Sequence, residues 1–367
     1  MPALLAAAAA RFSLTDGEIG MVGSSFLAGF GLVAATSNQW IGRFNWRHIV
    51  GVGTAVAVAG LAGCAAISSY GALLAALVAA GAGLGLLYTV SIAVVSENHK
   101  PDRAFGVKLA SEVFLAVAAL MGLTAFVTAR WGFAGTALTL AGVVGVVSLI
   151  GLPAIPSGRA LTPPAERFGM ARRAGGGAPL LRDWAPWLGL SALFVSFAGL
   201  SALWAFVSQM APSFGVDSRT GAVLLTIGLA VSGLAGLAAA GLGDRFGRIK
   251  PLATGMGLAL VGVGTLQFGH GLAAYFAGLL LAAGLWNFQL AYQMGIIASA
   301  DERGHVAVLM PAALAVGGAL GPMLAGALLT GGHGYLPLYA LFAATTAIGL
   351  AAFIVLGRRV AAAGART

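Results

Sequence analysis

Apolar runs of membrane-spanning length, separated by short polar breaks, make up almost the whole chain. A helix needs about 20 mostly apolar residues to cross a bilayer. Eleven such runs lie at about 18–38, 48–69, 71–95, 105–129, 132–155, 186–212, 218–240, 251–269, 271–297, 305–331 and 335–357. Their length and the lack of strict apolar–polar alternation predict helices and not strands.

One long polar stretch, residues 156–185, is rich in proline, glycine and arginine and predicts a linker. It separates an N-terminal helical bundle, residues 1–155, from a C-terminal six-helix bundle, residues 186–357, which a tail, residues 358–367, follows. We therefore expect an all-α membrane protein made of two bundles.

The amino-acid composition excludes an ordinary soluble protein. Only 8% of the residues are charged and 59% are hydrophobic, whereas soluble domains contain about 25% charged residues. The net charge of +9 does not indicate nucleic-acid binding, because the cations lie in short breaks and do not form a recognition face. The single cysteine, Cys64, lies in an apolar run, and we find no metal-ligand spacing, cofactor motif or catalytic cluster in the sequence. We expect no enzymatic activity, no metal and no cofactor.

Lysine and arginine predict the orientation in the membrane, because cytoplasmic loops are enriched in them. With a cytoplasmic linker and alternating helices, 17 of the 20 cations lie on the cytoplasmic side. The other three are Arg11, Arg130 and Arg219. We expect a multi-pass protein of a bacterial inner (plasma) membrane with a cytoplasmic linker and C-terminus.

Three pairs of loop positions in the two halves share a spacing of 202 or 203 residues, which indicates a duplication. The pairs are Arg43 and Arg245, Phe12 and Phe214, and Ser96 and Ser299. The apolar stub at residues 1–10 would span only about 15 Å as a helix, half of the hydrocarbon thickness. We interpret it as a truncated first helix and expect roughly 16–20 residues to be missing before it, through a misassigned start or a truncation.

The loop at residues 241–250 reads Gly-Leu-Gly-Asp-Arg-Phe-Gly-Arg-Ile-Lys. It resembles the G-x-x-[DE]-R-x-G-R-[RK] loop of the major facilitator superfamily, found between helices 2 and 3 and often again between helices 8 and 9. The chain is similar to uncharacterised bacterial efflux permeases of that family. The resemblance implies two bundles of inverted repeats, a site near the middle of the membrane and alternating access.

The resemblance also implies that this loop latches the carrier in one conformation, whereas a basic turn that only fixes topology is the simpler interpretation. The gating-loop candidates are Gly241, Asp244, Arg245, Gly247, Arg248 and, in the first-half copy, Arg43. Asp244 could cap the next helix or pair with Arg245 or Arg248.

The first-half copy of the loop departs from the pattern. Gly42 stands in the position of Asp244, and Asn45-Trp46-Arg47 replaces the second Gly-Arg pair, which argues against a symmetric latch. The stretch 317–322, Gly-Gly-Ala-Leu-Gly-Pro, is similar to the glycine–proline motif that drug antiporters carry in helix 5. Here it lies in the run 305–331, so drug efflux is only one option.

Polar side chains at membrane depth usually face the bundle interior or a water-filled cavity. Their helical spacing predicts two cavity faces, one in the run 271–297 and one in the run 186–212, with a weaker candidate in the run 71–95. The predicted solute-binding residues are Trp286, Gln289, Tyr292 and Gln293, then Ser201, Trp204 and Ser208, and finally Tyr88. Asn287 lies across its helix among small residues, and we expect it to bond another helix.

Glu112 is the one acidic residue clearly inside an apolar run, about seven residues or ~10 Å from its start. At that depth it could exchange a proton and couple transport to a proton gradient. Lys108 lies one turn earlier on the same face, and an ion pair between the two would instead make Glu112 structural.

These features predict a monomeric secondary transporter embedded in membrane lipids, with a small neutral or amphipathic organic solute and protons as the coupling candidate. Efflux is the function that we favour. Sugar or metabolite uptake, and a decayed carrier that serves as a membrane scaffold, are the alternatives. Saturable flux would distinguish a carrier from a scaffold.

The orientation can be tested with single cysteines placed in the linker and at position 366 after Cys64 is replaced. Because 17 of the 20 cations lie on one side, we expect an impermeant thiol reagent to label both positions only from the cytoplasmic side. Labelling of either position in intact cells would contradict the orientation.

Overall fold

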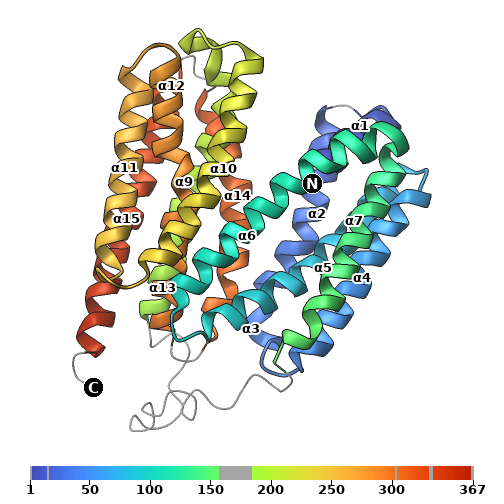
Figure 1. Ribbon diagram of the computed structural model, residues 1–367, viewed down its shortest axis with the longest axis horizontal. Coiled ribbons are helices and arrows are strands. Elements are labelled where there is room, and N and C mark those ends of the chain that lie inside the picture. The colour runs from blue at the N-terminus through green and yellow to red at the C-terminus, as the bar shows by residue number, and fades with distance from the viewer. Residues whose placement is uncertain (1, 15, 157–183, 302–303, 330–333, 365–367) are drawn as a thin grey trace. The chain divides into compact units, whose positions relative to one another are not determined.

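The computed structural model describes residues 2–14, 16–156, 184–301, 304–329 and 334–364. Within these ranges every regular element is a helix (Figure 1), which confirms the all-α fold class. The predicted linker, residues 156–185, lies almost entirely outside the described residues.

The chain forms two compact units. Unit 1 contains Met1–Val94 and Ala116–Gly175, and unit 2 contains Val95–Leu115 and Gly176–Thr367. Helix α6 (Pro101–Gly122) therefore begins in unit 2 and ends in unit 1.

The core of unit 1 lies between α1, α4, α5 and α7, where Leu4, Leu61, Leu77 and Phe133 are buried. The short α1 belongs to this core, because the ring of Phe12 packs edge-on against Phe133 at 5.6 Å. The elements of unit 1 besides α6 are α1 (Pro2–Phe12), α2 (Asp16–Ala35), α3 (Ser37–Trp40), α4 (Trp46–Ala66), α5 (Tyr70–Ser96), the π-helix η1 (Leu123–Thr128), α7 (Ala129–Gly151) and η2 (Leu152–Ala154).

The core of unit 2 includes Leu203, Met210, Leu279 and Phe342. Besides the start of α6, the unit contains α9 (Trp184–Met210), η4 (Ala211–Phe214), α10 (Ser218–Leu242), α11 (Ile249–Phe268), α12 (Gly271–Leu279), the π-helix η5 (Leu280–Gly284), α13 (Trp286–Ala300), η6 (Ala307–Leu309), α14 (Met310–Leu329) and α15 (Leu336–Gly364).

Nine helices among the described residues are long and apolar enough to cross a membrane by length and composition. The predicted run 18–38 contributes a shorter apolar helix, Met21–Ala35. The predicted run 105–129 is formed by α6 and η1, and charged side chains such as Lys108 and Glu112 lower its hydropathy. Each of the eleven runs therefore coincides with helix.

Large apolar side chains cover the outside of the helices. Ile150 is 75% exposed and Phe268 is 81% exposed, whereas a soluble protein rarely exposes wide apolar patches. A bilayer is the solvent in which such a surface is stable.

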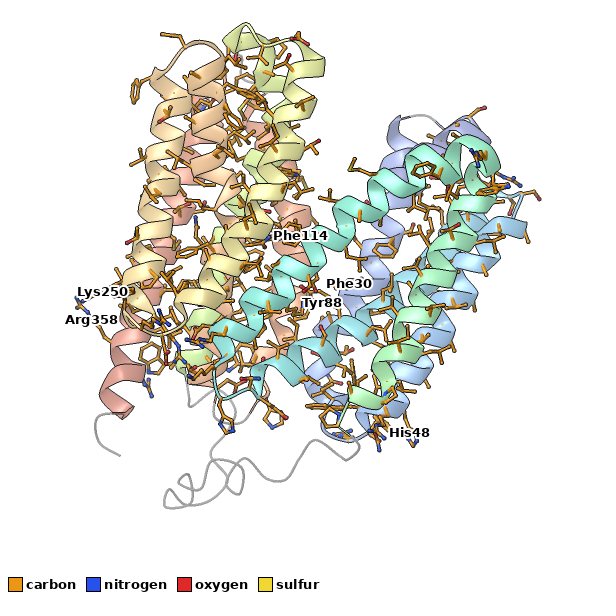
Figure 2. The ribbon with its side chains drawn as sticks, in the orientation of Figure 1. Phe30, His48, Tyr88, Phe114, Lys250 and Arg358 are labelled. Atoms are coloured by element: carbon orange, nitrogen blue, oxygen red, sulfur yellow. The ribbon has the colours of Figure 1, made fainter. Side chains whose placement is uncertain are left out.

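Two cations of unit 2 lie close together. Figure 2 shows Lys250, in the first turn of α11, beside Arg358 near the end of α15. The one-sided distribution of the cations and the orientation in the membrane stay predictions.

Glycines let α4 and α5 approach backbone to backbone. A Cβ atom on Gly60 would lie 2.6 Å from the amide nitrogen of Ala80 and 2.7 Å from the carbonyl oxygen of Ala76. A Cβ atom on Gly63, one turn later on the same helix, would meet nothing within 4 Å. Small residues have this role in membrane bundles because they permit close packing.

We expect Gly60→Ala to destabilise unit 1 by about 1–3 kcal/mol, because the added methyl group forces two backbones apart. Thermal unfolding in detergent measures the effect, and Gly63→Ala is the matched control, expected to be neutral or slightly stabilising. Equal melting temperatures for the two variants would contradict this account of α4–α5 packing.

Candidate functional site

A cavity of about 250 Å³ lies in unit 2 among α9, α10 and the α12–α13 segment. The side chains around it are apolar, aromatic or hydroxyl-bearing, and none of them is charged. The lining residues are Phe197, Leu200, Ser201, Trp204, Gly228, Leu229, Ser232, Ala283 and Trp286.

Helix α9 supplies one wall of the cavity. Phe197, Ser201 and Trp204 follow one another at intervals of four and three residues, so they share one helical face. Trp204 is 41% exposed. The sequence predicted Ser201 and Trp204 in this wall, whereas the third predicted residue, Ser208, is exposed and is not among the lining residues.

The opposite wall forms where a membrane helix is interrupted. The π-helix η5 separates α12 from α13, and Leu285 then leaves the helical region with φ −92° and ψ 7°. Immediately after this break Trp286 enters the cavity wall and stacks on Phe197, with ring centroids 5.9 Å apart at 29°. π-bulges frequently occur at functional sites, and discontinuous helices form the solute sites of many transporters.

A buried hydrogen bond joins α10 and α13 behind the cavity. The side-chain nitrogen of Asn287 donates to the hydroxyl oxygen of Ser232 at 3.3 Å, and the Ser232 hydroxyl donates to the carbonyl of Leu229 at 2.7 Å. Asn287 is only 1% exposed. The predicted interhelical role of Asn287 is thus confirmed.

The glycine–proline stretch of α14, residues 317–322, packs against α9. The Ser201 hydroxyl donates to the carbonyl of Gly317 at 3.0 Å. A side chain on Gly321 would collide with Ser201 and with the backbone of Ala198. These glycines therefore bring α14 into direct contact with the helix that carries the cavity wall.

The remaining predicted solute residues lie in three places. Gln289 and Gln293 border a small void of about 20 Å³ together with Trp286, and the Gln289 amide donates to the carbonyl of Gly255 at 3.0 Å. Tyr292 is buried, and its hydroxyl donates to the carbonyl of Gly243 at 2.9 Å, so it contacts the predicted gating loop. Tyr88 lies in unit 1, where its ring packs against Phe30 at 5.6 Å (Figure 2).

The loop between α10 and α11 is held against the start of α6. Nε of Arg248 donates to Oδ2 of Asp102 at 2.7 Å, and the Asp102 side chain is only 2% exposed. A side chain on Gly295 of α13 would collide with the Asp102 carboxylate, so this glycine makes room for the ion pair. Gly243 and Gly247, with φ of +53° and +70°, allow the reversal of the loop.

Asp102 is a functional candidate that the sequence reasoning missed. Asp244, four residues before Arg248, was one candidate partner for it, but the partner of Arg248 in the structure is 146 residues away. Asp244 is exposed, and α11 begins without a side-chain cap, so the predicted capping by Asp244 is wrong. The available signal was an acidic residue directly after Pro101, at the start of a helix.

Hydrogen bonds within unit 1 hold the first-half copy of the loop, which contains Asn45, Trp46 and Arg47. Asn45 caps α4 by accepting the backbone N–H of Arg47 at 2.9 Å, and the buried indole of Trp46 donates to the carbonyl of Ile41 at 3.0 Å. The Arg47 guanidinium donates to the carbonyls of Pro153 in η2 and of Ile155 directly after η2. The departures from the motif therefore provide a local hydrogen-bonded turn, while Arg43 is exposed.

Lys108 and Glu112 form an ion pair on α6, in the part of the helix that belongs to unit 2. The Lys108 side chain is 9% exposed and that of Glu112 is 41% exposed. The pairing matches the structural interpretation of Glu112, whereas proton coupling stays a prediction.

The loop between α13 and α14 is organised by Asp301. Its Oδ2 accepts the backbone N–H groups of Val306 and Ala307, each at 2.7 Å. Burial raises the pKa of the Asp301 carboxyl, and these hydrogen bonds lower it in part. The Asp301 carboxylate consequently takes up a proton more readily than an aspartate exposed to water.

The helical fold and the apolar exterior are those of a multi-pass membrane protein. Residues 189–366 match the family model described as Major Facilitator Superfamily. This match over almost half of the chain and the fold of the chain both support a transporter of the major facilitator superfamily.

Solved structures of this superfamily share the fold at low sequence identity. The Escherichia coli fucose:proton symporter FucP is 15% identical with a TM-score of 0.73, covering 98% of this chain and 94% of its own. The proton:xylose symporter XylE is 13% identical with a TM-score of 0.73, covering 98% and 91%. The human organic anion transporter MFSD10 is 18% identical with a TM-score of 0.67, covering 96% and 88%. No curated protein matches the sequence significantly.

The Asp102–Arg248 pair predicts an unequal response to charge removal. Arg248→Gln leaves a buried carboxylate without its cation, whereas Asp102→Asn leaves a guanidinium whose side chain is 24% exposed and can reach water. We expect Arg248→Gln to lower stability by about 3–5 kcal/mol and Asp102→Asn by less.

Thermal unfolding of both variants in detergent measures the difference, with Arg245→Gln, an exposed cation of the same loop, as the control. A loss of stability in Arg245→Gln as large as in Arg248→Gln would contradict the stabilising role of the Asp102–Arg248 pair.

Proposed function

We propose that the protein is a secondary transporter that moves a small neutral or amphipathic organic solute across the membrane by alternating access. The 250 Å³ cavity, which lies midway along α9 and α10 and has no charged side chain in its lining, is the observation that carries this proposal. Binding sites for organic solutes are usually apolar and aromatic cavities with a few polar groups. Phe197, Trp204 and Trp286 supply the aromatic surface, and Ser201 and Ser232 supply the polar groups.

The 243–248 loop serves as the gate in this proposal. Alternating access requires contacts that form in one conformation and break in another. The Asp102–Arg248 pair and the Tyr292–Gly243 hydrogen bond connect the loop to α6 and α13, so both are the contacts that we expect to break. Hydrogen bonds from Arg47 to the carbonyls of Pro153 and Ile155 hold the first-half loop within its own unit.

Efflux of an amphipathic compound is favoured over sugar uptake by the chemistry of the lining. FucP and XylE are described as sugar symporters, but a likeness at 15% identity or below supports a common fold and not a common solute. A sugar without an apolar substituent covers little of this mostly apolar lining, and many of its hydroxyl groups would lack hydrogen-bond partners. In this proposal the protein lies in the inner membrane with its linker in the cytoplasm.

A solute screen in proteoliposomes tests the proposal, with saturable flux as the measurement. Trp204→Ala removes the largest exposed aromatic surface of the cavity, and we expect its half-saturation concentration to rise by about tenfold. Gln293→Ala should have a smaller effect, because this side chain borders only the 20 Å³ void.

Gln209→Ala is the control for this series, since Gln209 is exposed on the same helix α9 and does not line the cavity. Normal kinetics in Trp204→Ala for every accepted solute would refute the site. The absence of saturable flux for all solutes would favour a membrane scaffold.

Proton coupling through Glu112 has a separate test. If Glu112 carries the proton, Glu112→Gln abolishes accumulation driven by a pH gradient but leaves solute exchange intact, because a neutral amide cannot release a proton. Since this variant also leaves the Lys108 ammonium without its carboxylate, the Lys108→Gln/Glu112→Gln double variant is the matched control for stability. Unchanged pH-driven accumulation in both variants would make Glu112 a structural residue.

A further inference from the structure

The cavity between α9 and α13 has two aromatic surfaces. At one end, Phe197 and Trp286 stack on each other and present a continuous apolar wall. Trp204 lies seven residues after Phe197 on the same face of α9, or about 10 Å along the helix. Because the Trp204 side chain is 41% exposed, much of its indole surface is open for a solute to cover.

Both hydroxyl groups that line the cavity donate their protons to backbone carbonyls. Ser201 donates to the carbonyls of Gly317 and Ala198, and Ser232 donates to the carbonyl of Leu229. A hydroxyl oxygen also has two lone pairs. Ser201 is partly exposed and therefore presents acceptor sites to the cavity, whereas Ser232 is only 1% exposed and its oxygen already accepts from Asn287. A solute that bonds the Ser201 oxygen has to supply an O–H or N–H group.

Charge and volume narrow the solute class further. No lining residue carries a cation or an anion, so an ionised solute would lose its hydration without gaining a counter-ion. A volume of about 250 Å³ lies just below the range of about 300–1,000 Å³ that is usual for ligand pockets. It is suited to a solute with one or two rings.

We propose that the cavity selects uncharged aromatic solutes of one or two rings that carry a hydroxyl or N–H donor. The ring lies against the indole of Trp204 and the Phe197–Trp286 pair, and the donor bonds the hydroxyl oxygen of Ser201. This inference rests on the proposed transport function and adds the solute class.

Phenyl β-glucoside and cyclohexyl β-glucoside are suitable probes, because they share the sugar and ring size and differ in aromaticity. Counterflow into proteoliposomes containing the full-length chain measures their half-saturation concentrations. We expect the phenyl compound to show a half-saturation concentration about three to ten times lower, which corresponds to aromatic stacking. D-xylose, which has donors but no ring π-system, should be the poorest solute.

Variants of Trp204 identify the source of the preference. Trp204→Leu retains an apolar side chain without an aromatic face, and we expect it to abolish the preference for the phenyl compound. Trp204→Phe should retain it, which separates aromaticity from a folding defect. Trp184→Leu is the matched control, because Trp184 lies on the same helix but its ring contacts Arg359 outside the cavity.

Equal half-saturation concentrations for the two glucosides would overturn the inference, and so would an undiminished phenyl preference in Trp204→Leu. Saturable flux of D-xylose with no flux of either glucoside would also overturn it, while the proposed transport function would stand. Failure of all three solutes to show saturable flux would count against both proposals.

Discussion

The low-dielectric interior of a bilayer is the constraint on which the rest of this structure depends. Lipid provides no hydrogen-bond partners, so each backbone N–H and C=O group in a span has to be satisfied within the protein. Helices satisfy these groups along their own length. Their association cannot rely on the hydrophobic effect, since lipid is as apolar as the side chains, and it depends on close packing instead. Gly60 in unit 1 and Gly321 in unit 2 are positions where a side chain would prevent that packing.

The same constraint explains why the interruption between α12 and α13 is significant. Between α12 and α13 the backbone changes to a π-helix, and the residues of this segment are mostly buried within the unit. The interruption turns Trp286 toward Phe197 and leaves a cavity beside it. Ser201 and Ser232 border this cavity, and both donate to backbone carbonyls. Helix irregularity, aromatic surface and hydrogen-bond acceptors thus coincide at one site.

The two related loops, one before α4 and one before α11, are stabilised by different interactions. The loop before α11 uses two glycines with positive φ and sends Arg248 to a buried carboxylate of α6. The loop before α4 places a buried indole where the other has its arginine, and neutral hydrogen bonds hold it. An ion pair at low exposure is strong only while both partners stay in place, whereas local hydrogen bonds persist whatever the neighbouring helices do. This difference concentrates the proposed gating on a single loop.

The apolar runs by themselves determined the all-α class and the positions of the helices, because bilayer thickness imposes a length that is readable in the chain. The spacing of Ser201 and Trp204 on one face was likewise readable, and so was the interhelical role of Asn287, since both follow from helical periodicity. Only the tertiary structure decided that Ser208 lies outside the cavity, that Tyr292 contacts the loop and that Arg248 pairs with Asp102. A partner 146 residues away in sequence is set by how helices pack, and the interruption at η5 depends on that packing as well. Helical periodicity describes the faces of one helix, but it contains no information about which other helix each face meets.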